Sequence, residues 1–365
     1  MREAVIIGAG PAGSLAAMLL ARGGWSVTLV EQHRFPRDKV CGECLSALGV
    51  QVLERHGLLD GIFARGAVSL QRTSLHACDG SLATIDLPRT MLGISRQIFD
   101  EYLMDNARAA SVMILQPARC EAIEAVDEHV TLAIRDLQTN AIMTRCTPWV
   151  IVADGKGTSG RGSSAPTDDF GIKSHWRDVD SPRDCIELFG CRGCYGGLAP
   201  IEDGRWNVAF SVPADRLHEH KGDLDALFAE LMKENPTLQR KLARATQFAP
   251  WLASPLPRYA VREHWEHRVI PIGNAAAAIE PIGGEGMGLA LRSAEIAGEA
   301  LTTSDGVQVD SSSLRAQFKR LWRAPSMAYR AGAIVASSQR LSCAAVPLFS
   351  AQEDLCRTAL RAFGK

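Results

Sequence analysis

The chain has 365 residues, with 40 Lys and Arg against 41 Asp and Glu and a formal net charge of -1 at pH 7. Hydrophobic residues make up 46% of it and charged residues 22%, which excludes a disordered or fibrous protein, and the near-neutral balance argues against a dedicated nucleic-acid binder. At roughly 100–200 residues per domain, the length predicts two domains.

Nothing in the sequence predicts export or a membrane span. No apolar run approaches the roughly 18 residues that a transmembrane helix needs. The first predicted strand begins at Ala4, which leaves no room for a signal or transit peptide. Ten cysteines are too few for a disulfide scaffold in a chain of this length, so we expect reduced thiols and a cytoplasmic protein.

The first 31 residues predict a strand, a glycine turn, a helix and a second strand. Residues 4–7 form an apolar run, residues 8–13 contain the turn, and the apolar residues that follow have helical spacing. The second strand, residues 26–30, closes with Glu31. This order is typical of a βαβ unit that binds a dinucleotide.

Strands and helices continue along the rest of the chain. Helices are predicted at residues 97–110, 224–233 and 286–301, and strands at 131–134, 141–146, 149–153, 186–189, 206–212 and 269–273. Residues 194–200 and 206–210 predict a hairpin. In residues 170–248 predicted strands alternate with turns, and Trp and Tyr occur among them. This change in composition and pattern indicates a second domain.

The glycines of the first turn have distinct physical purposes. Gly8 permits the tight turn, Gly10 lets a pyrophosphate approach the backbone, and Gly13 allows close packing of helix on strand. The helix N-terminus offers unpaired N–H groups and a positive dipole end to phosphates. Glu31 lies 18 residues after Gly13, where its carboxylate is placed to accept a hydrogen bond from a ribose hydroxyl. The unit therefore predicts a bound dinucleotide.

A second glycine-rich segment indicates the kind of dinucleotide. Residues 270–276 form a strand end with a polar turn, and residues 279–289 carry a run of glycines into a long helix. Such a segment is a nest for an anion or a carbonyl group. A plain nicotinamide dehydrogenase does not need two nests some 260 residues apart. A long cofactor, with a pyrophosphate at one end and a polar ring system at the other, does need them.

These residues resemble flavoproteins of the glutathione-reductase structural class, in the group that includes p-hydroxybenzoate hydroxylase, flavin-dependent halogenases and geranylgeranyl reductases. The resemblance covers most of the first 300 residues and implies FAD as the cofactor. Four segments carry it: residues 8–13 with Glu31; residues 39–43; residues 94–96 with Phe99, Asp100 and Leu103; and Asp154, Gly155, Thr158 and Arg161 together with Gly273, Asn274 and residues 281–289.

The resemblance implies a role for each segment. Lys39 and Cys41 belong to the segment that runs beside the flavin, and Arg96 lies where the family places an arginine or glutamine near the pyrophosphate or ribityl chain. The family usually has Asp where this chain has Asn274, and Asn still accepts a hydrogen bond but brings no charge. N–H groups of residues 283–287 would face the pyrimidine end of the flavin and stabilise its reduced state. The implied FAD contacts are Gly8, Gly10, Pro11, Ala12, Gly13, Glu31, Lys39, Cys41, Arg96, Asp154, Asn274, Pro281, Gly284, Gly286 and Met287.

The implied fold class is α/β (α+β), a Rossmann-like GR2-type FAD-binding domain with a discontinuous mixed-sheet substrate domain and C-terminal helices. We expect the FAD-binding domain at residues 1–70, 93–165 and 260–305, the substrate domain at 71–92 and 166–259, and the helical segment at 306–365. In the family the mixed sheet covers the substrate pocket. Candidates to line the pocket are Trp176, Tyr195, Trp206 and Phe210, although a place in the core is the interpretation that we favour for each of them.

The cysteines allow three interpretations. Cys41 with Cys44 and Cys191 with Cys194 form two C-x-x-C pairs, a spacing found in zinc sites. The 146 residues between the pairs far exceed the roughly 15–20 of a zinc ribbon, so we expect no metal. Related reductases carry a similar Cys-Gly motif, which implies that Cys41 is a redox thiol beside the flavin. Buried, inert thiols are the interpretation that we favour.

The C-terminal segment is basic. Residues 315–365 carry nine Lys and Arg against two acidic residues. Basic amphipathic helices favour anionic lipid, so peripheral contact with a membrane is one interpretation. The other, which we favour, is that these helices cover the core and present a solvated basic face.

Three functions remain open at this point, with no catalytic residue assigned. The first, which we favour, is a monooxygenase that NADH or NADPH reduces and that hydroxylates a hydrophobic aromatic or polyketide-like substrate in a pocket that excludes water. The second is a reductase or dehydrogenase that acts on C=C bonds of a lipid, as geranylgeranyl reductases do. The third is a flavoprotein without turnover that binds a partner or passes electrons to it. The Trp-x-Trp-x-Ile-Pro motif of flavin-dependent halogenases is absent from the sequence, which argues against halogenation.

Overall fold

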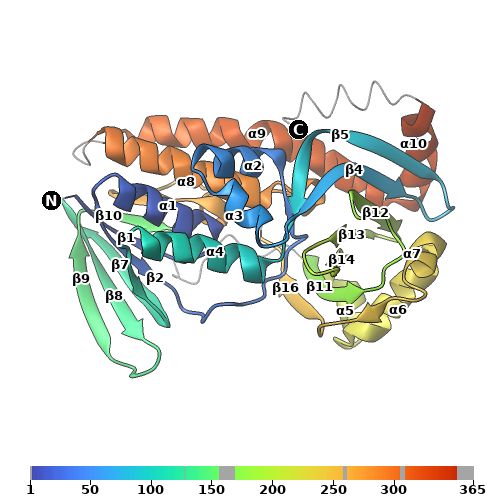
Figure 1. Cartoon of the computed structure of the whole chain (residues 1–365), viewed down its shortest axis with the longest axis horizontal. Coiled ribbons are helices and arrows are strands. Elements are labelled where there is room, and N and C mark those ends of the chain that lie inside the picture. Colours follow the sequence, from blue (N-terminus) through green and yellow to red (C-terminus); the bar gives the residue numbers. More distant parts are fainter. Residues whose placement is uncertain (1, 127, 156–168, 258–260, 305–308, 352–365) are drawn as a thin grey trace.

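The computed structural model contains three β-sheets with helices packed around them (Figure 1). It describes residues 2–126, 128–155, 169–257, 261–304 and 309–351. The five-stranded and three-stranded sheets lie at the left of Figure 1, and most of the nine-stranded sheet lies at the right.

The five-stranded sheet is parallel and has the order β17-β10-β1-β2-β6. Its strands are β1 (Glu3–Ile7), β2 (Ser26–Val30), β6 (Met113–Leu115), β10 (Trp149–Val152) and β17 (Val269–Pro271). The sequence predicted all of them except β6, which is too short to show a period. Strand β17 ends two residues earlier than predicted, because Gly273 starts a 3-10 turn, η1 (Gly273–Ala275), at φ +57°.

Alternate residues of β1 are buried on two different faces. Ala4 and Ile6 pack into the core on the helix side, and Val5 and Ile7 pack on the other side. The helix side is covered by α1 (Pro11–Arg22), α4 (Arg96–Ala109) and α8 (Gly286–Thr303). The other side is covered by the antiparallel strands β7 (Ala118–Val126), β8 (His129–Asp136) and β9 (Ile142–Thr147). Burial on both faces explains why these parallel strands are continuous apolar runs in the sequence.

The nine-stranded sheet is mixed. Its order is β15-β11-β14-β13-β12-β4-β5-β3, with β16 beside β11 and a parallel pairing between β4 and β12. Its strands are β3 (Cys44–Leu45), β4 (Val68–His76), β5 (Leu82–Gly93), β11 (Asp169–Arg177), β12 (Cys185–Cys191), β13 (Cys194–Pro200), β14 (Trp206–Pro213), β15 (Thr246–Gln247) and β16 (Leu252–Pro255). The predicted hairpin is confirmed, since β13 and β14 pair antiparallel with Leu198 opposite Val208.

Short helices cover one face of this mixed sheet. They are α5 (Ala214–Glu219), α6 (Leu224–Glu234) and α7 (Pro236–Lys241). Leu227 and Leu231 of α6 are buried in one cluster with Val208 of β14. The opposite face, which includes Ile186 and Ala209, borders a cavity.

The remaining helices connect the two halves of the molecule. Helices α2 (Ala47–Arg55) and α3 (Leu59–Phe63) follow β3, and α9 (Ser311–Ser337) and α10 (Gln339–Ala351) follow α8. Helix α9 contacts α8, the turn η2 (Pro281–Gly283) and strands β12 and β13, and α10 packs against α9 and β5 (Figure 1). Among the described helices, none has the length and apolar character that a membrane crossing requires.

This architecture confirms the predicted fold class. A parallel sheet with the βαβ start lies beside a mixed sheet that is assembled from separate parts of the chain, and helices close the described C-terminal part. Strand β3 joins the mixed sheet although it lies in a stretch predicted for the FAD-binding domain.

Candidate active site

The glycine turn after β1 leaves no space for a side chain at Gly8 or at Gly13. Gly8 has φ +96°, and a Cβ atom there would lie 2.6 Å from the carbonyl oxygen of Ala153. A Cβ atom on Gly13 would lie 1.8 Å from the carbonyl oxygen of Gly8. Helix α1 begins at Pro11 with Gly10 as its N-cap, and no side chain caps it. A helix start without a side-chain cap leaves its N–H groups for a ligand such as a phosphate.

Glu31 supports this turn from the end of β2. Its Oε2 accepts a hydrogen bond from the Ala9 N–H at 2.8 Å, and its Oε1 accepts one from the His33 N–H at 2.7 Å. The residue is buried, yet it also lines the cavity beside the turn. Glu31 therefore fixes the turn, and its contact with a ribose stays a prediction.

A polar cavity of about 250 Å³ lies next to the glycine turn. Five of the predicted FAD contacts line it, namely Gly8, Gly10, Glu31, Lys39 and Asp154. Other polar and charged residues on its wall are Gln32, His33, Arg37, Asp38 and Arg119. We call this space the polar cavity.

Two arginines stand at the polar cavity, of which Arg96 is buried and Arg37 is half-buried. Arg96 donates two hydrogen bonds of 2.7 Å to Asp100, and Arg37 lies 3.5 Å from the same carboxylate. Within the described part of the chain, the buried Nε of Arg37 has no hydrogen-bond partner, and burial lowers the pKa of this guanidinium. An unpartnered donor on a cavity wall fits an anionic oxygen. Arg37 is not among the FAD contacts predicted from the sequence, although it lies two residues before Lys39.

Residues 39–44 run from the polar cavity into a second cavity. Lys39 lines the first, and Val40, Cys41, Gly42 and Cys44 line the second. The second cavity has a volume of about 510 Å³, and we call it the apolar cavity. A long cofactor with a charged end and a ring system can extend along this segment.

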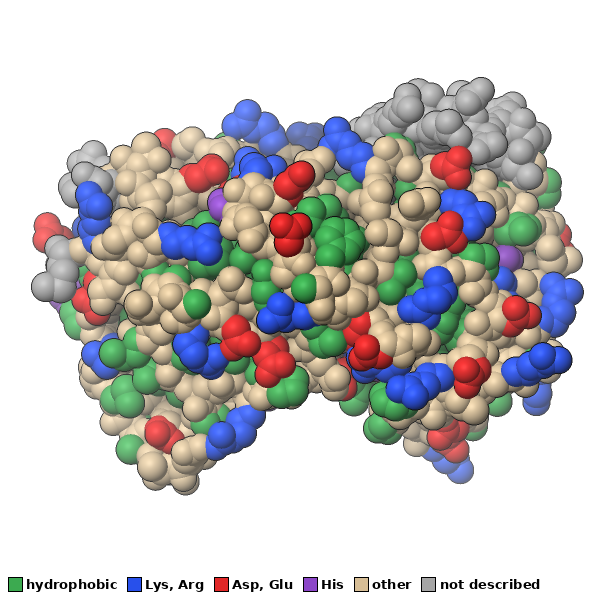
Figure 2. Space-filling view, viewed as in Figure 1, with side chains coloured by type: hydrophobic (Ala, Val, Ile, Leu, Met, Phe, Trp, Pro, Cys, Tyr) green, Lys and Arg blue, Asp and Glu red, His purple; other side chains and the backbone are tan. Residues whose placement is uncertain are grey.

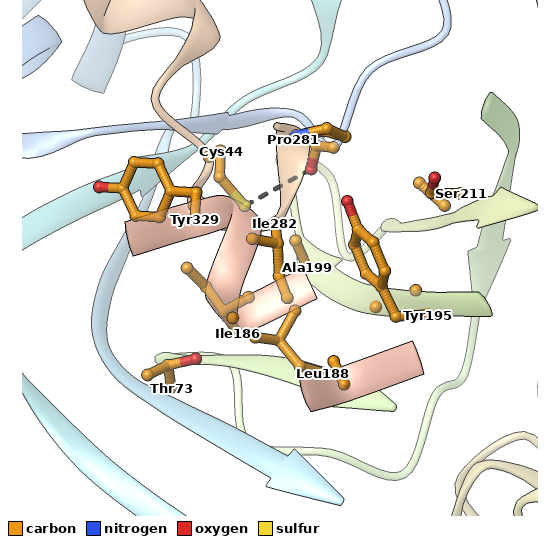
Figure 3. Close-up of a pocket in the computed structure, with 18 of the residues that line it drawn as sticks. Cys44, Thr73, Ile186, Leu188, Tyr195, Ala199, Ser211, Pro281, Ile282 and Tyr329 are labelled. Atoms are coloured by element: carbon orange, nitrogen blue, oxygen red, sulfur yellow. Dashed lines mark hydrogen bonds between the residues drawn. The ribbon is translucent and has the colours of Figure 1, made fainter. Parts of the chain in front are cut away.

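The wall of the apolar cavity consists mostly of apolar side chains and backbone. Strands β4, β5, β12, β13 and β14 form one part, residues 281–284 form another, and α9 forms a third (Figure 3). No charged side chain of the described residues lies on this wall. The lining side chains with polar atoms are Cys41, Cys44, Thr73, Tyr195, Asn207, Ser211 and Tyr329.

The aromatic residues predicted to line a substrate pocket divide into two groups. Tyr195 lines the apolar cavity, and Phe210 both borders this cavity and packs in the core cluster behind it. Trp176 and Trp206 pack in the core between the mixed sheet and α6, which is the placement favoured from the sequence for each of these candidates. The cause is the alternation along a strand, which turns Trp206 to the face opposite to its neighbour Asn207.

Helix α9 holds the glycine-rich turn that precedes α8. Pro281 and Gly284, two of the predicted contacts, line the apolar cavity, and Gly284 has φ +66°. A Cβ atom on Gly283 would lie 2.5 Å from the ring of Tyr329, so the ring occupies the place of a side chain (Figure 3). The Oη of Tyr329 donates a hydrogen bond of 3.2 Å to Glu285 Oε1.

One hydroxyl on the cavity wall is held by a buried carboxylate. The Oη of Tyr195 donates a hydrogen bond to Glu280, which directly precedes the 281–284 turn. Burial raises the pKa of Glu280, although the hydrogen bond from Tyr195 acts in the opposite direction. Together the two residues can hold and pass a proton at the edge of the apolar cavity.

A buried cluster of charges lies behind the same wall. Glu43 is fully buried, with Lys173 Nζ 2.6 Å from its Oε1 and His175 Nε2 2.6 Å from its Oε2. The Arg96 N–H donates to Oε1 at 2.8 Å, and Lys173 also donates to Asp38 at 2.9 Å. Burial by itself would raise the pKa of Glu43, but the charge of Lys173 and the hydrogen bond to His175 hold it at about 2. The carboxylate is therefore ionised and anchors the flavin-side segment.

This cluster also contains the ligand types of a metal site. Asp38, Glu43 and His175 have ligand atoms within 4.8 Å of one another. The ammonium group of Lys173 lies against both carboxylates and repels a second cation. Within the described ranges this is the only such group, so the two C-x-x-C pairs do not converge on a zinc site, and the nine described cysteines are free thiols.

The other predicted FAD contacts lie outside the walls of both cavities. Pro11, Ala12 and Gly13 begin α1, and Asn274 is exposed in η1. Gly286 begins α8 at an open position, and Met287 is buried in the core. Thr158 and Arg161 lie outside the described residues.

The two cavities fit the two ends of one cofactor. Donors and cationic groups at the polar cavity suit a pyrophosphate, and the apolar cavity suits a ring system. The fold and the site therefore define a flavin-dependent oxidoreductase. Residues 1–304 match the family described as an FAD binding domain, and the chain belongs to this family. The superfamily and the FAD-binding character predicted from sequence are thereby confirmed.

Individual relatives differ in their reactions. The menaquinone reductase of Mycolicibacterium smegmatis is 27% identical over 324 residues, which cover 84% of this chain and 77% of that protein. The kynurenine 3-monooxygenase of Stenotrophomonas maltophilia is 27% identical over 345 residues, which cover 84% of this chain and 73% of that protein. A solved triple mutant of the flavin-dependent brominase Bmp2 has a TM-score of 0.83 at 18% identity, over 98% of this chain and 93% of that one. At this identity the structural likeness establishes the fold alone.

Glu31→Arg is expected to weaken the retention of FAD by about tenfold or more, because a carboxylate acceptor is replaced by a cation that only donates hydrogen bonds. Flavin absorbance after gel filtration, at equal protein concentration, measures the effect. Glu31→Gln keeps one acceptor oxygen and is the matched control, with a smaller expected loss. A folded Glu31→Arg protein that stays as yellow as the parent would show that the ribose is placed wrongly.

Acid is expected to destabilise the protein through three buried carboxylates. Glu43, Glu187 and Glu295 each have a pKa of about 2 instead of 4.5, because ion pairs and hydrogen bonds outweigh the effect of burial. A folded-state pKa below the unfolded value stabilises the fold above about pH 4.5, and this contribution is lost as the pH falls toward 2. Urea unfolding should therefore give a free energy of unfolding that declines steadily below about pH 4.5.

The variant Glu43→Gln distinguishes the contribution of Glu43 to acid sensitivity from the contributions of Glu187 and Glu295. The variant should be less stable than the parent at pH 7 by about 3–5 kcal/mol, because Lys173 is left buried without its main partner. It should also lose less stability on acidification than the parent does. Equal acid sensitivity in parent and variant would contradict the assignment of Glu43.

Proposed function

We propose that the chain is an FAD-dependent reductase that adds hydrogen across a C=C bond of an uncharged, hydrophobic lipid, such as an isoprenoid or a prenylated quinone. The observation that carries the proposal is the wall of the apolar cavity, on which no described side chain is charged. A carboxylate or ammonium group of a substrate would find no partner there, whereas an uncharged chain or ring system needs none. We therefore favour C=C reduction over hydroxylation, whereas the sequence alone favoured hydroxylation.

The comparison with curated proteins supports the same class of substrate. The relative from Mycolicibacterium smegmatis is named for its action on menaquinone, an isoprenoid quinone, and it aligns over 84% of this chain. The volume of about 510 Å³ lies within the usual range for small-molecule sites.

FAD, when bound, supplies the two-electron chemistry. The residues of the chain bind and orient it. The N-terminus of α1, Gly10 and Arg37 would hold the pyrophosphate, Glu31 would accept from the ribose, and Lys39, Cys41 and the 281–284 turn would contact the flavin half. The apolar wall keeps water away from the reacting atoms.

Reduction of a C=C bond also requires a proton at the second carbon. Tyr195 is positioned to give this proton from its Oη, since it lies on the wall of the apolar cavity. Glu280, whose protonated form is favoured by burial, can return a proton to Tyr195 along their hydrogen bond. We therefore assign Tyr195 as the proton donor and Glu280 as the residue that recharges it.

Hydroxylation is the second candidate function. It is favoured by the same exclusion of water, which a flavin enzyme that uses dioxygen needs to avoid side reactions. The relative from Stenotrophomonas maltophilia is named as a monooxygenase and also aligns over 84% of this chain.

We further propose NADH or NADPH as the electron donor and a cytoplasmic location. The division into an FAD-binding domain, a substrate domain and C-terminal helices keeps the boundaries predicted from sequence. The strand order supports it, because β4 and β5 join β11 to β16 in one mixed sheet.

Product analysis distinguishes the two candidate functions. The FAD-loaded protein is incubated with NADH or NADPH, with a menaquinone or a geranylgeranyl compound, and under isotope-labelled dioxygen; simple phenols are the comparison substrates. We expect a lipid product that has gained two hydrogen atoms and no labelled oxygen, and equal yield without dioxygen. Incorporation of a labelled oxygen atom would contradict the reductase and support the monooxygenase.

Tyr195→Phe is expected to slow electron transfer to the substrate by about 100-fold, because the proton donor is removed. Reduction of the bound flavin by NADH or NADPH should be unchanged, and stopped-flow absorbance measures the two half-reactions separately. Ser211→Ala removes a different hydroxyl from the same wall and should behave as the parent does. A parental rate in Tyr195→Phe would show that the proton comes from elsewhere.

A further inference from the structure

The outer face of α9 exposes apolar and basic side chains together. Met327 is 74% exposed and Ile334 is 57% exposed. They lie seven residues apart, which places both on the same face of the helix. Arg320, Arg323 and Arg330 lie seven, four and three residues from Met327, so these exposed arginines flank it. We call these five residues the α9 outer face.

The charged residues of the C-terminal helices α9 and α10 are all basic. Residues 311–351 contain six Lys and Arg and no Asp or Glu. In the part of the chain that the structure describes, Arg320, Arg323 and Arg330 form no ion pair, whereas Lys319 pairs with Glu263 at 3.4 Å. Lys and Arg side chains are visible along the upper edge of Figure 2, where Figure 1 places α9.

We propose that the α9 outer face docks the protein on the surface of an anionic phospholipid bilayer. Met327 and Ile334 would enter the boundary between headgroups and acyl chains, and the three arginines would bind headgroup phosphates. Since no described helix can cross a membrane, the docking is peripheral.

A second copy of the chain fits this face less well. A symmetric dimer through the α9 outer face would bring three arginines against three arginines, and neither α9 nor α10 carries a carboxylate to neutralise them. An anionic bilayer offers the opposite charge together with an apolar phase.

The inner face of the same helix lines the apolar cavity, through Ala328, Gly332 and Val335. Docking would therefore bring the wall of the substrate cavity next to the bilayer. Delivery of a lipid substrate by this route rests on the proposed function, whereas the docking rests only on the α9 outer face.

Vesicle co-sedimentation tests the docking without substrate or turnover. The full, FAD-loaded chain is mixed with sucrose-loaded vesicles of phosphatidylcholine and phosphatidylglycerol in equal amounts, and with vesicles of phosphatidylcholine alone. We expect binding to the anionic vesicles that is about tenfold or more tighter than to the neutral ones and that weakens as salt is added.

Two variants separate the apolar and the charged parts of the face. Met327→Ser with Ile334→Ser, and Arg320→Gln with Arg323→Gln and Arg330→Gln, should each weaken binding about tenfold or more. Val126→Ser with Ile142→Ser is the matched control, since these residues are 47% and 55% exposed on the three-stranded sheet, and it should bind as the parent does. All of these side chains are exposed, so the variants should keep FAD and their melting temperature.

Failure to bind anionic vesicles, or parental binding by both outer-face variants, would overturn the docking. Light scattering that shows a dimer abolished by these variants would also overturn it and would assign the face to a second copy. Because none of these measurements uses turnover, they leave the proposed reaction to its own test.

Discussion

The buried carboxylate of Glu43 joins the two halves of the site. Glu43 lies in the flavin-side segment, and its partners Lys173 and His175 lie on β11 of the mixed sheet. All three residues are at most 2% exposed, so water solvates neither the carboxylate of Glu43 nor the ammonium group of Lys173. Loss of one partner of such a pair costs about 3–5 kcal/mol. The same contacts hold Glu43 in the left-handed backbone conformation, at φ +56°, which a residue with a Cβ atom adopts only when its surroundings enforce it.

The contacts of Glu43 explain how a cluster of buried charges can lie beside a cavity whose described wall carries no charged side chain. Glu43 turns away from the cavity toward β11, while Cys41 and Gly42 face the cavity. The amide of Asn207 on β14 donates a hydrogen bond of 3.1 Å to the Cys41 carbonyl, so a second strand of the mixed sheet holds the segment. The charged groups of Glu43, Lys173 and His175 are paired behind the wall, and the described residues on the wall present backbone and uncharged side chains to the cavity.

The local part of the site could be predicted from the sequence, and the part formed by distant contacts could not. Gly8, Gly13 and Glu31 lie within one βαβ unit, where spacing alone fixes their positions. Glu43 meets Lys173 across 130 residues of chain, and a lysine on a strand of mixed polarity gives no periodic signal of its partner. The strand that holds Trp206 was predicted correctly, but its alternation alone does not tell which of its two faces borders the cavity.

Helix α9 completes the wall, and its sequence does not mark it as part of a site. The ring of Tyr329 lies where Gly283 would carry a side chain, and this contact fixes the rotation of α9 against the 281–284 turn. With that rotation set, Ala328 and Gly332 face the apolar cavity, and Met327 and Ile334 must point outward. Burial therefore does not explain why apolar residues occupy positions 327 and 334, since polar residues there would leave the cavity and the turn unchanged. The proposed docking on an anionic bilayer would bury these two side chains and pair the arginines beside them with headgroup phosphates.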